Sequence, residues 1–457
     1  MTGAYFLRPC LHMKPRERQT QPTPSVSAKP DARLSALELV SAVMRQRKPL
    51  DDVFNAAVDG LEPRDRAFAR LLAATVLRRL GQIDAVLTQF LDREPPAKVH
   101  DALRLGAAQI LFIGTPPHAA VATCVDLVKQ IGQQRFSGLV NAVLRRVLEH
   151  GPNALGSQDV AQLNTPAWLW QRWLSAFGES TARAIAQAHA LEAPIDLTLK
   201  DQTATTLWAE KLNAKVLPHG GLRLNDSGRV EQLPGFAEGA WWVQDSAAML
   251  PAQILLHEMG DAKGKAVVDL CAAPGGKTLQ LAAAGCDVTA LDISAKRLAL
   301  LSDNLQRTGL RANVVTADAL TWRPAQPVDA VLLDAPCSST GTIRRHPDLP
   351  YLKRPDDFPR LAQRQRDMLQ AAATMLKPGG VLVYSVCALE PAEGEEVVDA
   401  VLAIDPSLTR QPIRIESIGN QSQFLTPRGD VRTLPCHWPE LGGLDGFYAA
   451  LLRKSTV

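Results

Sequence analysis

Two cysteines stand where apolar, β-branched segments end, a position that suits a reactive thiol. The run VLVYSVCAL places Cys387 at the end of one such segment, and VDAVLLDAPCSS places Cys337 in a similar position. A thiolate is a strong nucleophile that forms covalent intermediates with electron-poor carbon atoms. A single free cysteine at a strand end is more often a small buried hydrophobic residue. The pair, rather than either residue alone, therefore suggests covalent chemistry.

Four aspartates lie along successive predicted strands in the same half of the chain. Asp269 lies within the first of these strands, and the next three strands end at acids, Asp292, Asp318 and Asp334. In an open α/β sheet, ligands bind at the carboxyl ends of the strands. Acids on four successive strands favour a binding site for a ligand with hydroxyl and amino groups. The alternative interpretation, that they are four unrelated helix caps, is less favoured.

The loop CAAPGGKT follows the first of these strands and is the predicted cofactor loop. It fails the G-x-x-x-x-G-K-[ST] pattern of phosphate loops, because Cys271 stands where a glycine is required, and it also lacks G-x-G-x-x-G. S-adenosylmethionine carries no phosphate and is the better candidate, with Asp292 binding its ribose hydroxyls and Asp318 its adenine amine. The loop residues expected around this cofactor are Cys271, Ala272, Ala273, Pro274, Gly275, Gly276 and Lys277.

Two of these loop residues have a more specific expected role. Cys271 is expected to line the cofactor through its backbone. Lys277 is expected to neutralise the cofactor's carboxylate or to support the loop, with a solvated lysine at a helix start as the alternative.

An alternation of strands and helices must position these residues. From about residue 241 onward, apolar strand segments alternate with helical segments such as SAKRLALLSDNLQRTG. This order predicts an α/β domain over 241–457, with a parallel sheet covered by helices on both faces. The final segment GFYAALLRK is expected to add a strand at the C-terminal edge.

The part of the chain before residue 241 has a different pattern of apolar residues. Apolar residues recur at helical spacing in segments such as RAFARLLAATVLRRL, which predicts an all-helical bundle. The tryptophans of PAWLWQRWLSAFG are expected to pack inward. The predicted parts are a disordered tail over 1–30, the bundle over 31–150, a helical linker over 151–195 and a small α+β insert over 196–240.

Charge and cysteine content limit the possible partners. Residues 1–150 carry 21 Lys and Arg against 14 Asp and Glu, whereas the rest carries 29 against 33. A basic front half suits a polyanion such as nucleic acid, although an ordinary solvated helical surface is equally compatible. Seven cysteines without a C-x-x-C pair predict reduced thiols and no metal site. The absence of a long apolar segment predicts a cytoplasmic protein without a membrane partner.

Several of these motifs together resemble one enzyme family. DLCAAPGGKT, the acid of ALDIS, the ADA segment, DAPCSSTGTIRRHPD and the Cys387 segment resemble the RNA cytosine carbon-5 methyltransferases of the Fmu/Sun class, over roughly 241–453. DRAFARLLAATVLRRLGQID, within 32–149, is similar to the NusB-type helical RNA-binding bundle. The resemblance implies an all-α NusB-like bundle followed by an α/β Rossmann-like S-adenosylmethionine-dependent methyltransferase domain.

The resemblance also implies a substrate and a mechanism. The substrate would be RNA, with small-subunit ribosomal RNA expected first and transfer RNA or another RNA as the alternative, and the chain would act as a monomer. Carbon 5 of cytosine is a poor nucleophile, so a thiolate first adds to carbon 6, and a base later removes the carbon-5 hydrogen. By similarity, Cys387 is the nucleophile and Cys337 assists release. Asp334 would hold either the cofactor's amino group or the cytosine edge.

Two details near the thiols leave questions open. Val386 and Ala388 stand where the family usually has threonine and serine, so a hydroxyl that could polarise the Cys387 thiol is missing. Beyond Cys337, the run RRH at 344–346 is expected either to reach RNA phosphates or to line a solvated loop.

Two other classes of function remain compatible with the motifs. One is an RNA-binding protein whose α/β part is a cofactor-sensing or structural remnant, but its intact thiols and acids argue against it. The other is a nucleotide-dependent dehydrogenase or ATPase, which the failed glycine patterns disfavour.

Overall fold

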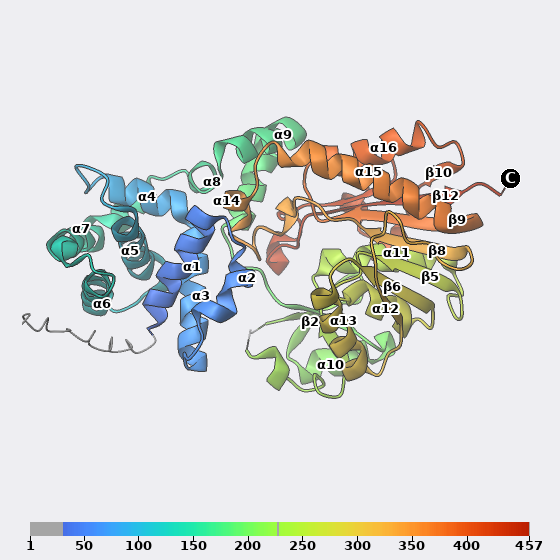
Figure 1. The fold of residues 1–457 in the computed structure, drawn as a ribbon, viewed down its shortest axis with the longest axis horizontal. Helices are drawn as coiled ribbons and strands as arrows, with labels where there is room; N and C mark the ends of the chain where they lie inside the picture. Colours follow the sequence, from blue (N-terminus) through green and yellow to red (C-terminus); the bar gives the residue numbers. More distant parts are fainter. Residues whose placement is uncertain (1–30, 226–227, 457) are drawn as a thin grey trace, which may run out of the picture.

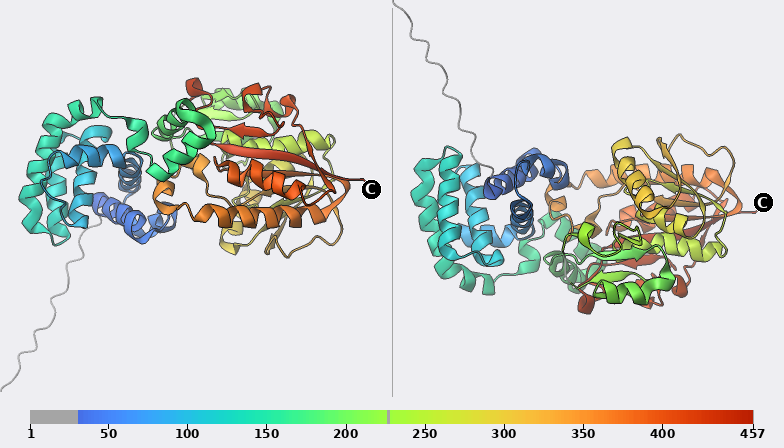
Figure 2. Two further views of the ribbon diagram at one scale, coloured as in Figure 1. Left: turned by 90° about the horizontal axis from the view of Figure 1, so that it is seen from above. Right: turned by 90° about the horizontal axis from the view of Figure 1, so that it is seen from below.

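The computed structural model describes residues 31–225 and 228–456 of the chain. The predicted disordered tail over 1–30 lies outside the described residues. A helical domain, a small sheet and a large α/β domain follow one another along the sequence (Figure 1). Views from above and below show the helical domain and the α/β domain lying end to end (Figure 2). Among the described residues, no helix is long and apolar enough to cross a membrane.

The helical domain is a bundle built around one hydrophobic core. Helix α1 begins at Asp31, whose side chain accepts a hydrogen bond from the Arg33 amide, and ends at Arg47 in a left-handed conformation. The helices of the bundle are α1 (Ala32–Gln46), α2 (Leu50–Ala57), α3 (Pro63–Arg78), α4 (Leu80–Thr88), α5 (Ala97–Ala108), α6 (Pro117–Gln130) and α7 (Ser137–Gly156).

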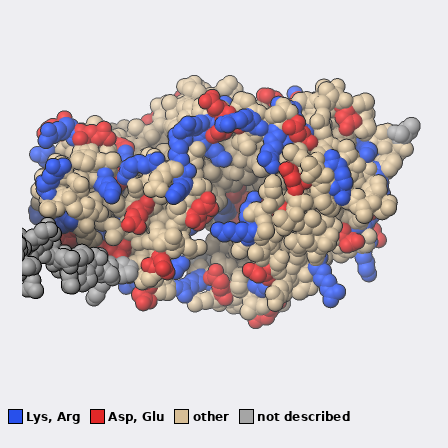
Figure 3. All heavy atoms as spheres, in the orientation of Figure 1, with Lys and Arg blue, Asp and Glu red and all other residues tan. Residues whose placement is uncertain are grey.

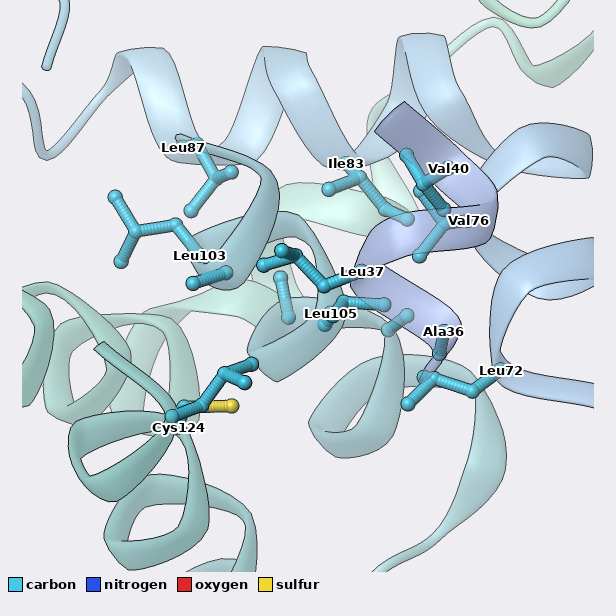
Figure 4. Close-up of a cluster of buried hydrophobic side chains, with 14 of the residues drawn as sticks. Ala36, Leu37, Val40, Leu72, Val76, Ile83, Leu87, Leu103, Leu105 and Cys124 are labelled. Carbon is cyan, nitrogen blue, oxygen red and sulfur yellow. The ribbon is translucent and has the colours of Figure 1, made fainter. Parts of the chain in front are cut away.

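The core of this bundle is formed by aliphatic side chains that recur at helical spacing. Leu37, Val76 and Leu103 are among the buried residues from different helices that meet there (Figure 4). Cys124 lies in the same core, and burial raises the pKa of its thiol to about 12. This cysteine is therefore part of the core packing.

Helix α7 continues past residue 150, where the sequence analysis placed the end of the bundle. Its buried face extends from Val140 to Gly151, so packing against the core carries the helix through Gly151 and Pro152. Two further helices follow, α8 (Val160–Leu163) and α9 (Ala167–His189). As predicted, tryptophans of α9 point inward, with Trp170 and Trp173 buried.

A small antiparallel sheet with strand order β2-β3-β1-β4 comes next. It extends beyond residue 240, the predicted end of the insert, because Leu197 of β1 pairs with Val243 of β4. Its elements are β1 (Asp196–Leu199), α10 (Thr205–Lys211), β2 (Ala214–Val216), β3 (Leu222–Leu224) and β4 (Trp241–Val243).

The large sheet has eight strands and a parallel centre. The order is β10-β12-β9-β8-β5-β6-β7, and β11 pairs with β12. Strands β5 to β9 run parallel, and β12 is antiparallel to β9. The strands are β5 (Ala266–Leu270), β6 (Asp287–Asp292), β7 (Asn313–Thr316), β8 (Val328–Asp334), β9 (Leu376–Val386), β10 (Leu408–Gln411), β11 (Val431–Thr433) and β12 (Phe447–Lys454).

This topology confirms the predicted α/β class and corrects the place of the last strand. Strand β12 is not at the edge, because β10 pairs along its other side over Leu408–Gln411. The chain runs outward from β5 through β6 to β7 and then crosses back to β8, which pairs with the other side of β5. Ligands of open α/β sheets bind at such a switch point, outside the carboxyl ends of the strands.

Helices cover both faces of the large sheet (Figure 1). One face packs against α11, α12 and α13, and the other packs against α15 and α16. The helices are α11 (Ser246–Met259), α12 (Gly276–Ala283), α13 (Ala295–Thr308), α14 (Leu349–Leu352), α15 (Asp357–Met375) and α16 (Glu395–Leu402). Short helix α14 lies in the loop that connects β8 to α15.

Candidate active site

A cavity of about 430 Å³ opens at the carboxyl ends of the parallel strands. Residues that follow or end β5, β6, β7, β8 and β9 all contribute to its wall. The predicted site residues that line this cavity are Cys271, Ala273, Asp292, Asp318, Asp334, Cys337 and Cys387. The fold therefore brings both thiols and three of the strand-end acids to one place.

The two thiols are in direct contact. Strands β8 and β9 are parallel neighbours in which Asp334 pairs with Ser385, so the residues that follow both strands meet beyond the sheet edge. The Sγ atoms of Cys337 and Cys387 lie 3.4 Å apart. The hydrogen bond to Cys387, together with burial, raises the pKa of Cys337 well above its usual range.

Lys277 and Asp334 form an ion pair beside the thiols. Lys277 Nζ lies 2.7 Å from Asp334 Oδ2, and Ser385 Oγ donates to Asp334 Oδ1 at 3.2 Å. The Lys277 side chain is only 11% exposed, so it is not a solvated lysine at a helix start. Burial alone would lower the pKa of Lys277, but the neighbouring charges of Asp334 and Cys387 raise it. The buried Lys277 ammonium therefore lies within electrostatic range of the Cys387 side chain.

Two acids lie at the opposite side of the cavity. Asp292 ends β6 and accepts hydrogen bonds from the Ser294 amide at 2.9 Å and the Ala273 amide at 3.3 Å. Asp318 lies two residues beyond the end of β7 and accepts one hydrogen bond from the Leu320 amide at 3.0 Å. Each carboxylate has lone pairs left for hydroxyl or amino groups in the cavity.

The sequence analysis missed several residues of this wall, among them Ile293 and Arg297. Ile293 is 62% exposed although it is large and apolar, and it lines the cavity directly after Asp292. Arg297 lines the cavity as well and donates to the Ala273 carbonyl. An apolar side chain beside a pair of acids fits a nucleoside, whose ring is apolar on its face and polar at its edge. The acids and the apolar side chain of this wall therefore fit S-adenosylmethionine, whose nucleoside has hydroxyl and amino groups beside an apolar ring face.

Most of the predicted cofactor loop packs against protein instead of lining the cavity. A Cβ on Gly275, whose φ is 113°, would lie 2.9 Å from Leu301 Cγ, and one on Gly276 would lie 3.0 Å from Gln244 Cδ. Ala272, Pro274 and both glycines are absent from the residues that line the cavity. These glycines allow close packing against α13 and Gln244, a role that depends on tertiary neighbours and leaves no signal in the motif.

Asp269 also lies behind the cavity and does not line it. It is fully buried and accepts a hydrogen bond of 2.5 Å from Thr278 Oγ1. Burial raises the pKa of Asp269 to about 7. This strand-end acid therefore anchors the start of α12 to β5.

Two buried glutamates support the loops that carry the thiols, and sequence reasoning missed both. Glu393 Oε2 accepts from the Ser338 amide and from Gln365 Nε2, each at 2.9 Å. Glu390 accepts from Thr340 Oγ1, and the same hydroxyl accepts from the Leu389 amide at 3.0 Å. The segment after Cys387 is thereby tied to the segment after Cys337.

The two arginines beyond Cys337 do not form a phosphate-binding loop, and His346 lies 3.4 Å from Asp51. The Arg344 side chain is 2% exposed and pairs with Asp445 at 3.3 Å. Arg345 pairs with Asp245 at 2.5 Å and with Asp445 at 2.8 Å. Both arginines hold the loop against neighbouring elements, because the charges that the sequence suggested for RNA are satisfied by aspartates distant in the chain.

The fold and the cavity define a Rossmann-like methyltransferase, and comparisons with known proteins identify its family. The family model described as 16S rRNA methyltransferase RsmB/F matches residues 256–453, and the NusB family model matches residues 30–149. The chain is 35% identical to ribosomal RNA small subunit methyltransferase B of Pseudomonas putida over 444 residues, covering 92% of this chain and 98% of the relative. It is 36% identical to the protein of the same description from Salmonella typhi, with the same coverage.

The chain therefore belongs to the ribosomal RNA small subunit methyltransferase B family, and its cofactor is S-adenosylmethionine. Solved structures agree with the fold. PH0851 has a TM-score of 0.70 at 24% identity and covers 92% of this chain and 98% of its own. A methyltransferase homolog protein from Pyrococcus horikoshii has a TM-score of 0.53 at 26% identity and covers 65% of this chain and 97% of its own.

Proposed function

We propose that this methyltransferase acts on carbon 5 of a cytosine in small-subunit (16S) ribosomal RNA, through a covalent bond between Cys387 and carbon 6. The observation that carries the proposal is the contact between two thiols, 3.4 Å apart, in the cavity lined by the acids. Transfer to a ring nitrogen or to a ribose hydroxyl requires no thiol nucleophile. Carbon 5 requires one, because it gains electron density only after a nucleophile adds to carbon 6.

The thiol contact supports the assignment of roles. Two adjacent thiols do not both ionise readily, because a second negative charge would stand beside the first. Cys337 is the thiol that retains its proton, since the hydrogen bond to Cys387 and burial raise its pKa. Cys387 is then the thiolate, with the Lys277 ammonium as its counter-charge. This arrangement compensates for the absence of a hydroxyl at Val386 and Ala388.

In the later steps the two thiols exchange roles, and Cys337 is the one that ionises. The bound cofactor supplies an electrophilic methyl group for carbon 5. Once the Cys387 sulfur is bonded to carbon 6, its negative charge is gone, so Cys337 can lose its proton to water in the cavity. The Cys337 thiolate then accepts the proton that leaves carbon 5, and elimination of the Cys387 sulfur restores the aromatic ring.

Other residues of the cavity hold the two substrates. Asp292 and Asp318 bind the ribose hydroxyls and the adenine amine of the cofactor, and Ala273 and Cys271 contribute their backbone. Asp334 accepts a hydrogen bond from an amino group, and both the cofactor and cytosine carry one. Residues Ala272, Pro274, Gly275 and Gly276 shape the loop rather than touch the cofactor.

Single substitutions of the two thiols test this proposal. Cys387→Ala should abolish methyl transfer and any covalent protein–RNA complex. Cys337→Ala should reduce turnover by about 10²–10⁴-fold, the usual contribution of a general base, while the covalent complex accumulates. Tritium transfer from labelled cofactor into unmethylated 16S ribosomal RNA and denaturing gels measure the two effects.

Cys436→Ala is a matched control, because this cysteine lies outside the cavity and should leave both readouts unchanged. A covalent complex that accumulates with Cys387→Ala and disappears with Cys337→Ala would reverse the assigned roles.

A further inference from the structure

A second open cavity of about 580 Å³ lies where the helical domain meets the α/β domain. Residues from the end of α1, the start of α2, α14 and the first turns of α15 line it. Leu361 and Arg364 of α15 line both this cavity and the active-site cavity, so the two are adjacent along that helix. We call the second one the junction cavity.

The carboxylates that line the junction cavity are already engaged. Asp51 has two partners, and the hydrogen bond with His346 together with the contacts to Arg70 lowers its pKa far below the usual range. The contacts are Asp51 with Arg70 at 2.8 Å and with His346 at 3.4 Å, Asp348 with the Leu50 amide at 2.8 Å, and Asp357 with Arg360 at 3.1 Å.

Three cations of the junction cavity have no such partner. Within residues 31–225 and 228–456, no carboxylate lies within 4.0 Å of the charged groups of Arg47, Lys353 or Arg364. The three come from different elements, since Arg47 caps α1, Lys353 ends α14 and Arg364 lies in α15. Lys and Arg side chains gather on this face of the molecule, over the region where α14 and α15 meet the helical domain (Figure 3). The cavity therefore carries a surplus of positive charge that the protein itself does not neutralise.

We propose that the RNA strand flanking the target nucleotide crosses the junction cavity, with its phosphates bound by Arg364, Lys353 and Arg47. The inference rests on the proposed placement of the target base beside Cys387. Because Arg364 lines both cavities, it binds a phosphate next to the target nucleotide, and Lys353 and Arg47 bind phosphates farther along the strand. Guanidinium groups bind phosphate oxygens in a bidentate manner, so the two arginines also orient the backbone.

A single strand fits this arrangement better than a duplex. The target base must leave any stack to reach the thiols at the bottom of its cavity, which is easiest for an unpaired nucleotide. The path also joins the two domains, since Arg47 belongs to the helical domain and Arg364 to the α/β domain. The helical domain thus contributes directly to the register of the RNA at the active site.

The salt dependence of RNA binding tests the proposal, because each phosphate contact adds a known increment to the slope of log K against log salt. The variants Arg364→Gln, Lys353→Gln and Arg47→Gln remove one charge each and leave the fold unchanged at exposed or half-buried positions. The plot of log K against log salt should become shallower by about 0.7 for each residue with a single-stranded 16S fragment, and by about 2 for the triple variant. The KM for RNA should rise, whereas the KM for S-adenosylmethionine should stay unchanged.

Arg366→Gln is the matched control, because Arg366 lies two residues along α15 from Arg364, on a different side of the helix, and donates a hydrogen bond to Gln363 at 2.7 Å. A triple variant with the same salt slope as Arg366→Gln would overturn the proposal, as would an equal rise in both KM values. Failure of the covalent mechanism would look different. The wild type would then bind RNA with the full salt slope and yet form no thiol adduct.

Discussion

At the scale of residues, the active site depends on two thiols that share one contact. Because the Sγ atoms of Cys337 and Cys387 lie 3.4 Å apart, ionisation of one suppresses ionisation of the other. Lys277 lies on the same side of the cavity, in an ion pair with Asp334. In the proposed mechanism, one thiol of the pair is ionised at a time, and the second ionises only after the first has bonded to carbon.

Glu390 gives a pH-dependent prediction at this scale. Burial raises the pKa of Glu390 to about 7, and it is only 3% exposed. A carboxyl group with a raised pKa favours folding at low pH, and this contribution is lost as pH rises from about 4.5 through 7. Glu390→Gln keeps a neutral side chain of the same shape. The difference in free energy of unfolding, Glu390→Gln minus wild type, should therefore increase between pH 4.5 and 8, by up to about 3 kcal/mol.

Urea unfolding at several pH values measures this difference. The exposed Glu416→Gln is a suitable control and should follow the wild type across the range. Parallel pH profiles for Glu390→Gln and the wild type would contradict a buried, protonated Glu390.

The sequence identifies several residues that line the cavity, but not their environments. Cys337, Cys387 and the strand-end acids could be found because each follows an apolar strand, and the sheet edge gathers them. The ion pair of Lys277, the exposure of Ile293 and the buried contacts of Glu393 depend on neighbours distant in the chain. The same reason explains why Arg344 and Arg345, expected either to reach RNA or to line a solvated loop, are bound to aspartates instead.

At the scale of elements, the loop from β5 to α12 positions part of the wall of the active-site cavity. Cys271 and Ala273 line the cavity, while the glycines that follow pack against α13 and Gln244. This loop therefore needs glycine for close approach within the protein. The left-handed conformation of Gly275 adds a second reason.

Gly275→Ala tests the close approach. The added Cβ meets Leu301, which is fully buried, and the φ of 113° is also unfavourable for alanine. We expect the free energy of unfolding to fall by about 2–4 kcal/mol, combining overpacking with backbone strain. Affinity for S-adenosylmethionine, measured by calorimetry, should fall as well.

Gly285→Ala is the matched control, because its φ is 84° but the nearest atom to an added Cβ is 3.6 Å away. It should lose only about 1–2 kcal/mol from backbone strain and keep its cofactor affinity. Equal losses in the two variants would show that contact with Leu301 does not matter.

The order of elements could be predicted, whereas their spatial order could not. Apolar strands alternating with amphipathic helices predict the parallel centre of the sheet. The antiparallel insertion of β12 between β9 and β10 depends on pairing with strands distant in the chain, which leaves no local signal in the sequence. Similarly, α7 passes Gly151 and Pro152 because the bundle core continues to bury its face.

At the scale of the whole molecule, hydrogen bonds fix the helical domain beside the active site. Tyr351 of α14 donates to the Leu77 carbonyl at 2.9 Å, and Arg78 donates to the Arg344 carbonyl at 3.0 Å. These contacts join the loop after Cys337 to α3. The basic character of the first 150 residues is consistent with RNA binding, but the sequence does not place Arg47 beside α15. Arg47 comes close to α15 only because the helical domain packs against the α/β domain.

The most direct measurement is to trap the enzyme on an RNA that carries 5-fluorocytosine at the target position. Fluorine cannot leave carbon 5 as a proton does, so the sulfur–carbon bond should persist after methyl transfer. Digestion and mass spectrometry of the complex should then find the nucleotide attached to the peptide that contains Cys387. Attachment to Cys337, to another side chain or to none would contradict the covalent mechanism.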